Sequence, residues 1–265
     1  FEVICSEIRK KRENNMNSFK FFPEGWKSEN IEETKEDILQ GVVTNCDNNY
    51  NLHVKTENGL EGIIPRAEIE AINIDKDGIP KANLCEGKVH KCVQFKLKEK
   101  DGDKFIFSRK DVQNEVLDCV KHDLKEGECL KGIVKNITPY GAFIDIGGGV
   151  VGLAYIEDLS VARIKSPYER LKIGQNVKIV VKSIDRKTGK INLSYKDTLG
   201  TWEENANKFQ TGMKTTGIVR ETEKNKNGIF IELTPNLVGM AEYKDGLNYG
   251  EKIDICIKKI DYDKK

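Results

Sequence analysis

The sequence predicts a mainly β protein made of three tandem five-stranded barrels joined by short helices, and two observations lead to this prediction. The first is a strand–turn–strand pattern over residues 132–159, in which apolar strands surround the turn Gly147-Gly148-Gly149. Glycine accepts the positive φ of a tight turn, and a glycine inside a strand permits the sharp bends that small closed barrels need. The second is that weaker copies of this pattern occur in residues 38–110 and 211–265.

The composition indicates a globular chain without a global basic signature. Its 265 residues are 33% charged and 38% hydrophobic, and the net charge is +1. No apolar run approaches the roughly 20 residues that span a membrane, and no signal peptide is visible. The seven cysteines are odd in number and form no CxxC pair, and the three histidines lack metal-ligand spacing. These features predict reduced thiols, no metal site and a cytoplasmic location.

Four segments are predicted along the chain. A helical and irregular leader that packs on the first barrel is predicted for residues 1–37. Residues 38–122 predict a first barrel with a linking helix, and residues 123–210 a second, best-formed barrel with another linking helix. Residues 211–265 predict a third barrel that lacks its last strand.

The two linking helices are indicated by apolar spacing and by a capping motif. Residues four apart form one face of a helix over residues 111–122: Val112, Val116 and Val120. In residues 198–210, Thr201 and Glu204 have the spacing of a capping box at a helix start. We expect the apolar face of this second helix to pack on a neighbouring barrel.

The units share one strand register. Val54 and Gly62 are separated by the same number of residues as Ile144 and Gly152. This equal spacing predicts that the second and third strands of the first two units pair in the same way.

The middle unit carries three aromatic side chains on adjacent strands. Small or branched residues alternate along its second strand: Ala142, Ile144 and Ile146. By the period of two these residues line the core, so Phe143 points outward. Tyr140 lies before a glycine at which a bulge can return its ring to the same face, and Tyr155 lies on the next strand. The alternative interpretation is that Phe143 caps the barrel and Tyr140 is a turn residue.

The other two units keep fewer of these rings. Tyr50 and His53 stand where the second unit has its first two rings, and Pro65 replaces the third ring. In the third unit only Phe230 remains, and Glu242 introduces a charge that repels phosphate at the position of the third ring.

The second unit resembles the S1 RNA-binding domain, which has an OB-fold barrel, and the tandem arrangement resembles the bacterial ribosomal protein S1 family. The resemblance is carried by Tyr-Gly-Ala-Phe-Ile-Asp from residue 140, Gly-Leu at 152, Leu-Ser at 159, Gly-Gln-x-Val-Lys at 174 and Leu-Ser at 193. It extends over residues 38–265 and is closest in the second unit.

The resemblance implies an RNA-binding surface on strands two and three and on the loop before strand five. Three rings of the second unit are assigned to base stacking: Tyr140, Phe143 and Tyr155. Two cations are assigned to phosphate contacts: Arg163 and Lys190. The carboxylate of Asp185 is expected to orient a base edge or a lysine. The candidates in the weaker units are Tyr50, His53, Arg66 and Phe230.

The leading expectation is a monomeric, non-catalytic protein that binds single-stranded RNA. The resemblance implies mRNA as the ligand and the small ribosomal subunit as the partner. A ring platform suits single strands because stacking needs unpaired bases and tolerates any sequence.

Two alternatives stay open. In one, the first and third units are protein-docking modules that bind the ribosome or another protein. In the other, the chain is the RNA-binding appendage of an RNA-processing enzyme. Within this sequence, Gly147-Gly148-Gly149 lacks the Lys-Ser/Thr of a phosphate-binding loop, and no paired His and carboxylate motif occurs. We therefore predict no catalytic residue, no cofactor, no metal ligand and no membrane partner.

Overall fold

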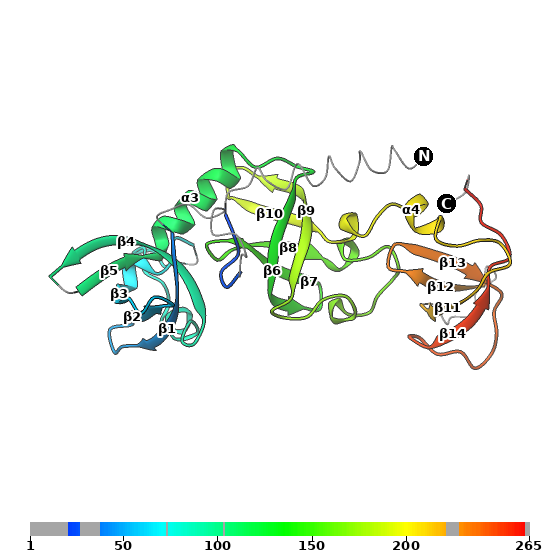
Figure 1. The fold of residues 1–265 in the computed structure, drawn as a ribbon, viewed down its shortest axis with the longest axis horizontal. Helices are drawn as coiled ribbons and strands as arrows, with labels where there is room; N and C mark the ends of the chain where they lie inside the picture. The colour runs from blue at the N-terminus through cyan, green and yellow to red at the C-terminus, as the bar shows by residue number, and fades with distance from the viewer. Residues whose placement is uncertain (1–20, 27–37, 73, 103, 221–227, 263–265) are drawn as a thin grey trace.

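The computed structural model of the protein describes residues 21–26, 38–72, 74–102, 104–220 and 228–262. Three β units follow one another along the chain and lie in a row (Figure 1). The first two are closed five-stranded barrels, here called barrel 1 and barrel 2, and the third is a four-stranded sheet, here called the third unit. The mainly β architecture is as predicted. The third unit was predicted as a barrel without its last strand, and over the described residues its four strands form an open sheet.

Barrel 1 has the strand order β1-β2-β3-β5-β4. Its strands are β1 (Leu39–Cys46), β2 (Leu52–Thr56), β3 (Glu61–Ile64), β4 (Cys92–Asp101) and β5 (Lys104–Ser108). Two short helices connect β3 to β4, namely η3 (Arg66–Glu68) and α2 (Ala82–Glu86). Alternate residues of β2 are buried, so this strand turns one face to the core and the other to the outside.

Barrel 2 has the order β10-β8-β7-β6-β9. Its strands are β6 (Cys129–Thr138), β7 (Gly141–Gly147), β8 (Val150–Tyr155), β9 (Asn176–Asp185) and β10 (Lys190–Ser194). The loop from β8 to β9 contains η4 (Ile156–Asp158) and η5 (Pro167–Glu169). Strand β10 closes the barrel by pairing in parallel with β8 and antiparallel with β9. Ala142, Ile144 and Ile146 are fully buried, which confirms the predicted core face of β7.

The two barrels share the predicted register. Val54 pairs with Gly62 in barrel 1, and Ile144 pairs with Gly152 in barrel 2. Each barrel also has a bulge at the same place in its first strand, opposite the second strand. Residues at equivalent positions in the two barrels can therefore be compared directly.

Helix α3 (Arg109–His122) links the two barrels and starts at Ser108, whose side chain accepts a hydrogen bond from the Asp111 N–H. The three valines predicted to share a face are buried in the core cluster of barrel 2: Val112, Val116 and Val120. Arg109 at the start of the helix instead donates to the carbonyl of Ile69 in barrel 1. The helix therefore takes part in the packing of both barrels.

Residues 21–26 form an irregular segment that contacts both barrels, whereas we expected it on the first barrel alone. Phe21 is buried in the core cluster of barrel 2. The Glu24 N–H donates to Asp145 Oδ2 on β7 at 3.1 Å, and Glu24 Oε1 accepts from the Gln94 N–H on β4 at 3.2 Å. The rest of the predicted helical leader lies outside the described residues.

The third unit has the strand order β13-β12-β11-β14. Its strands are β11 (Lys214–Val219), β12 (Ile229–Thr234), β13 (Leu237–Ala241) and β14 (Lys252–Cys256). It follows η6 (Lys196–Thr198) and α4 (Trp202–Ala206). The predicted capping box is present, because the Glu204 N–H donates to Thr201 Oγ1 at 3.2 Å and the Thr201 N–H donates to Glu204 Oε2 at 2.7 Å. In the part of the chain that the structure describes, no helix is long and apolar enough to cross a membrane.

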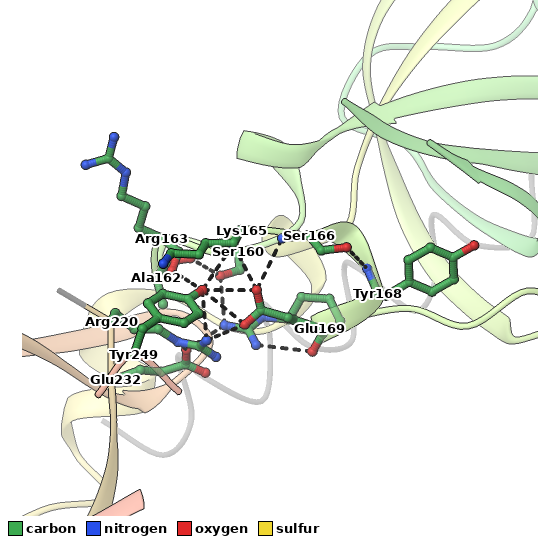
Figure 2. A network of polar contacts seen from close by, with 11 residues as sticks. Ser160, Ala162, Arg163, Lys165, Ser166, Tyr168, Glu169, Arg220, Glu232 and Tyr249 are labelled. Carbon is green, nitrogen blue, oxygen red and sulfur yellow. Dashed lines mark hydrogen bonds and ion pairs between the residues drawn. The ribbon is translucent and has the colours of Figure 1, made fainter. Parts of the chain in front are cut away.

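A network of charged side chains fixes the third unit on barrel 2 (Figure 2). Glu232 on β12 accepts hydrogen bonds from Arg170 Nη2 at 2.6 Å and from Arg220 Nε at 2.5 Å. Arg220 also pairs with Glu169, and the Tyr249 hydroxyl lies 3.0 Å from Glu169 Oε1. These contacts tie the β8–β9 loop of barrel 2 to strands of the third unit.

Candidate nucleic-acid interface

The three aromatic side chains assigned to barrel 2 lie together on the outside of the β7–β8 hairpin. Phe143 pairs with Leu153 and Gly141 pairs with Tyr155, and paired residues of antiparallel strands point to the same side of a sheet. Tyr140 directly precedes β7, and its ring centroid lies 6.2 Å from that of Phe143 with the planes at 85°. We call the surface formed by Tyr140, Phe143, Leu153 and Tyr155 the ring face.

The ring face is accessible to a ligand. The exposed fraction is 52% for Tyr140 and 39% for Tyr155, and Phe143 is half-buried. Phe143 is not part of the core cluster, because the inside of β7 is filled by Ala142 and Ile144. Phe143 therefore does not cap the barrel core, whereas Tyr140 does lie in the turn before β7, as the alternative interpretation expected.

A glycine explains how Tyr140 comes to stand beside Phe143. A Cβ at Gly141 would lie 2.3 Å from the carbonyl oxygen of Ala154, so only glycine permits the strands to approach this closely. The Ile156 N–H donates to the carbonyl of Tyr140 at 2.9 Å and holds the chain at this end of the hairpin. Both features position the Tyr140 ring over the outer face of the sheet.

Lys190 lies on the same outer face but at a distance from the rings. Asn192 on β10 pairs in parallel with Leu153, so Lys190 is level with Val151. Val151 and Tyr155 are four residues apart on β8, so Lys190 lies about 13 Å from Tyr155 along the strand direction. An exposed ammonium at this distance can contact the backbone of a strand whose bases lie on the rings, but not the stacked base itself.

Asp185 is committed to its own hairpin turn. One carboxylate oxygen accepts the Lys187 N–H at 3.0 Å, and the other accepts the Thr188 hydroxyl at 2.5 Å. The hydrogen bond from Thr188 is the main cause that lowers the pKa of Asp185. The carboxylate therefore shapes the β9–β10 turn next to Lys190, and its role toward RNA stays a prediction.

Arg163 lies at the joint with the third unit rather than on β7 or β8. Its carbonyl oxygen is 3.5 Å from the Tyr249 hydroxyl. Figure 2 shows its exposed guanidinium extending away from the Glu232 network. Arg163 and the ring face are thus separate parts of barrel 2.

Barrel 1 uses the equivalent positions differently. The Arg66 guanidinium lies 4.8 Å from the centre of the Tyr50 ring and donates two hydrogen bonds to the carbonyl of Pro80, at 3.1 and 2.9 Å. His53 Nε2 is 3.7 Å from the carboxylate of Asp47. One face of the single aromatic ring is therefore covered, and its arginine is engaged in holding a loop.

The third unit presents an apolar pair at the corresponding place. Phe230 on β12 pairs with Met240 on β13, and their exposed fractions are 41% and 64%. Beyond this pair, Glu242 forms an exposed ion pair with Lys258 at 3.0 Å. The ring of Phe230 is available, but it lacks the aromatic neighbours found in barrel 2.

Two asparagines next to the ring face were not anticipated from the sequence. Asn136 on β6 pairs with Phe143, and Asn192 on β10 pairs with Leu153. Both positions are on the outer side of the barrel. They could be identified only through strand pairing, since asparagine within a strand carries no binding signal by itself.

A buried charged cluster between the two barrels was also missed. Glu24 Oε1 accepts from Arg109 Nε at 2.7 Å, and Arg109 Nη1 pairs with Glu70 Oε2 at 2.9 Å. Burial and the charge of Glu24 raise the pKa of Asp145 to about 6, although Lys135 lies 3.3 Å away and opposes the shift. Burial is the largest influence on the pKa of Glu24 and raises it, but the charge and hydrogen bond of Arg109 together with the charges of Lys88 and Lys135 outweigh burial, so the pKa is lowered.

These buried charged side chains stabilise the contact between the two barrels and do not form a reactive site. Each is enclosed between the barrels and paired, so it offers no open position to a substrate. Among the residues that the structure describes, no group of three or more His, Cys, Asp or Glu side chains could hold a metal ion. The exposed chemistry of barrel 2 is that of aromatic faces, amides and lysines.

Comparison with known proteins agrees with this geometry. The family described as S1 RNA binding domain matches residues 32–110 and 123–196. Small ribosomal subunit protein bS1 from Staphylococcus aureus is 34% identical over 211 residues, which are 75% of this chain and 52% of that protein. The same-named protein from Rickettsia typhi is 34% identical over 170 residues, or 59% of this chain and 29% of that protein.

The chain thus spans about half or less of the length of these curated relatives. Among solved structures, GSP13 from Bacillus subtilis is 29% identical with a TM-score of 0.29, over 30% of this chain and 61% of that one. The two matched ranges coincide with the two closed barrels. The protein therefore belongs to the S1 RNA binding domain family and contains two copies of that domain.

Proposed function

We propose that this protein binds single-stranded RNA without catalysing a reaction, and that the ring face of barrel 2 is its principal contact. The observation that carries the proposal is the convergence of Tyr140, Phe143 and Tyr155 on one open surface of an S1 domain. Aromatic faces bind unpaired bases by stacking, and a stacked base contributes about 1–3 kcal/mol by substitution. Two or three such rings suffice for moderate affinity.

The positive charges have a secondary role in this proposal. Lys190 contacts an RNA phosphate on one side of the ring face, and Arg163 contacts the part of the RNA that lies nearer the third unit. The net charge of the chain is only +1, so long-range attraction is weak and stacking dominates the affinity. Sequence selectivity from stacking alone is low because every base has a π-face.

The biological setting is proposed from the relatives. Small ribosomal subunit protein bS1 is the name of the Staphylococcus aureus and Rickettsia typhi proteins. We propose accordingly that this chain acts in translation in the cytoplasm, that its ligand is mRNA and that its partner is the small ribosomal subunit, which it joins as a monomer.

Fluorescence anisotropy with a labelled, unstructured RNA tests the central claim. The variant Tyr140→Ala/Phe143→Ala removes two rings of barrel 2, and Tyr50→Ala/His53→Ala removes the equivalent side chains of barrel 1. We expect the first variant to lose at least about tenfold in affinity and the second to lose less than about twofold. In the wild type, log K should fall with log[salt] by about 0.7 per phosphate contacted.

Each outcome has a definite meaning. Equal binding by the wild type and the barrel 2 variant would refute the ring face as the RNA site. A larger loss in the barrel 1 variant would move the site to barrel 1. Turnover of the RNA by pure protein with magnesium would refute the non-catalytic proposal.

Protein docking by the third unit is a second candidate, favoured by one observation. The exposed Phe230–Met240 pair is followed by an exposed carboxylate at Glu242, which disfavours phosphate. Replacement of Met240 and Glu242 by alanine in the full chain should then weaken co-sedimentation with small ribosomal subunits and leave RNA oligonucleotide binding unchanged. The opposite pattern would assign this surface to RNA.

A further inference from the structure

A single row of side chains crosses the ring face at right angles to the strands. Asn136 on β6 pairs with Phe143 on β7, which pairs with Leu153 on β8, which pairs with Asn192 on β10. Neighbouring strands lie about 4.8 Å apart, so the four residues form a continuous line across the outside of the barrel. The central pair is apolar, and an asparagine stands at each end.

The amide of Asn192 is held in place. It is half-buried, and its Nδ2 donates to the hydroxyl of Ser183 at 3.0 Å, on the residue with which it pairs across β9 and β10. This bond uses one part of the amide, and the other part forms no hydrogen bond to any residue within the described ranges. A polar group that is already fixed by one hydrogen bond loses little conformational entropy when it binds a ligand.

The amide of Asn136 differs in this respect. It is exposed, and its side chain has no hydrogen-bond partner in the described part of the chain. Ordering it on a ligand costs more side-chain entropy than ordering Asn192. The two residues are therefore of the same type and in the same row, but only Asn192 is preorganised.

The fold itself does not require an asparagine at this position. The neighbouring residues Ile191 and Leu193 point into the core, so Asn192 points out, and the equivalent residue of barrel 1 is Ile106. A half-buried isoleucine occupies the same register there without any polar partner. Closure of this barrel type therefore does not depend on an amide at this position.

We infer that Asn192 hydrogen-bonds the edge of a base stacked on the ring face and so gives barrel 2 a base preference. The inference rests on the proposed RNA binding of this face and adds a recognition element to it. An asparagine amide offers both a donor and an acceptor, the groups that proteins use to read the edges of unpaired bases. One such hydrogen bond discriminates between bases by about two- to tenfold.

The test measures preference rather than affinity. The full chain is titrated by anisotropy with labelled oligo(A), oligo(C) and oligo(U) of about ten nucleotides, within the range that one OB-fold occupies. The wild type should favour one homopolymer over the least favoured by about three- to tenfold, and Asn192→Ala should reduce this ratio to within about twofold. Asn192→Thr keeps a hydroxyl for Ser183 and strand propensity, and it should reduce the ratio equally.

Asn136→Ala is the matched control, and it should keep most of the preference. The inference is overturned if the wild type binds the three homopolymers equally, or if folded Asn192→Ala and Asn192→Thr both keep the wild-type ratio. Tyr140→Ala/Phe143→Ala is measured in parallel. If that variant loses affinity while the Asn192 variants keep the preference, RNA binding by the ring face stands and only the role of Asn192 fails.

Discussion

Barrel 1 and barrel 2 have the same strand order and the same register, yet they use their outer faces in different ways. On β7 and β8 of barrel 2, Tyr140 and Tyr155 are open to solvent beside Phe143. On barrel 1, Arg66 covers Tyr50 and also holds the carbonyl of Pro80. The same strand order and register are therefore compatible with open aromatic rings and with a ring that an arginine covers on one face, and the difference depends on a few outward side chains.

The difference extends to the charged residues at the joint. Barrel 1 contributes Glu70 and Gln94 to the buried cluster around Arg109 and Glu24. Barrel 2 contributes Asp145 to the same cluster between the two barrels, while Tyr140 and Tyr155 at the opposite end of its β7–β8 hairpin are exposed to solvent. The comparison suggests that barrel 1 supports the assembly and barrel 2 binds the ligand, and the following predictions test this division.

The largest effect is expected from Arg109→Ala. This change removes the guanidinium that pairs with both Glu24 and Glu70. Glu70 keeps its ion pair with Lys88, whereas Glu24 loses the cation that it contacts at 2.7 Å, and an uncompensated buried charge costs about 3–5 kcal/mol. We expect the free energy of unfolding, measured by urea denaturation, to fall by that amount. Lys55→Ala breaks only an exposed ion pair with Glu61 and should leave the free energy of unfolding almost unchanged. Equal small losses in both variants would show that barrel 1 does not support the joint.

The pH dependence of stability should differ at equivalent positions of the two barrels. Asp145, whose pKa is raised to about 6, corresponds to the exposed Lys55 of barrel 1. The folded state binds this proton more tightly than the unfolded state, so the contribution of Asp145 to stability falls as pH rises from about 4 through the folded pKa of about 6, and it becomes constant only about one pH unit above that pKa. The loss is at most about 3 kcal/mol.

Urea denaturation of the wild type and Asp145→Asn at several pH values isolates this contribution. As pH rises from about 4 to 6, the free energy of unfolding of the wild type should fall relative to that of Asp145→Asn. The wild type should show no such fall relative to Lys55→Gln. A difference that is constant across this window would mean that Asp145 is ionised throughout it.

A smaller gain is expected when barrel 1 receives the missing rings. Pro65 has φ −58° and ψ 148°, close to the φ −65° and ψ 157° of Tyr155, so a tyrosine fits its backbone. In the Tyr140→Ala/Phe143→Ala background, His53→Phe/Pro65→Tyr should restore RNA affinity by about five- to tenfold in anisotropy. The control is His53→Ala/Pro65→Ala in the same background. If the grafted rings restore nothing in a folded protein, ring count does not explain the difference between the barrels.

The smallest effect is expected at single cations. Lys190→Ala should weaken RNA binding by about two- to threefold and reduce the salt slope by about 0.7, because one phosphate contact is lost. Arg66→Ala should leave the slope unchanged, since the Arg66 guanidinium is bonded to Pro80. A salt slope that responds to Arg66 and not to Lys190 would reverse the assignment of the two barrels.

Strand alternation and glycine spacing were sufficient to predict the barrels and the orientation of β7. Both signals are local, because they depend on the period of two and on turns with positive φ. The capping box at Thr201 and the valine face of α3 were predictable for the same reason. The ring face followed from these local rules together with the resemblance to a known family.

What the sequence left undetermined depends on contacts between distant residues. The joint around Arg109 unites residues that are 85 positions apart in the chain, and no local pattern encodes this pairing. The engagement of Arg66 by Pro80 and the level of Lys190 on β10 depend on loop conformation and strand register. The third unit was expected as a barrel without its last strand, and in the described range its four strands form an open sheet.

Helix α3 has a mechanical consequence. Its valines belong to the core of barrel 2, while Arg109 at its start is bonded to Glu70 and Ile69 of barrel 1. For barrel 1 to pivot, either the buried contacts of Arg109 with barrel 1 would have to break, or the valine side chains would have to leave the core of barrel 2 at roughly 1.5–3 kcal/mol for each fully buried one. Helix α3 is therefore a rigid linker between the two barrels and not a flexible one. We therefore expect the two barrels to move together as one body.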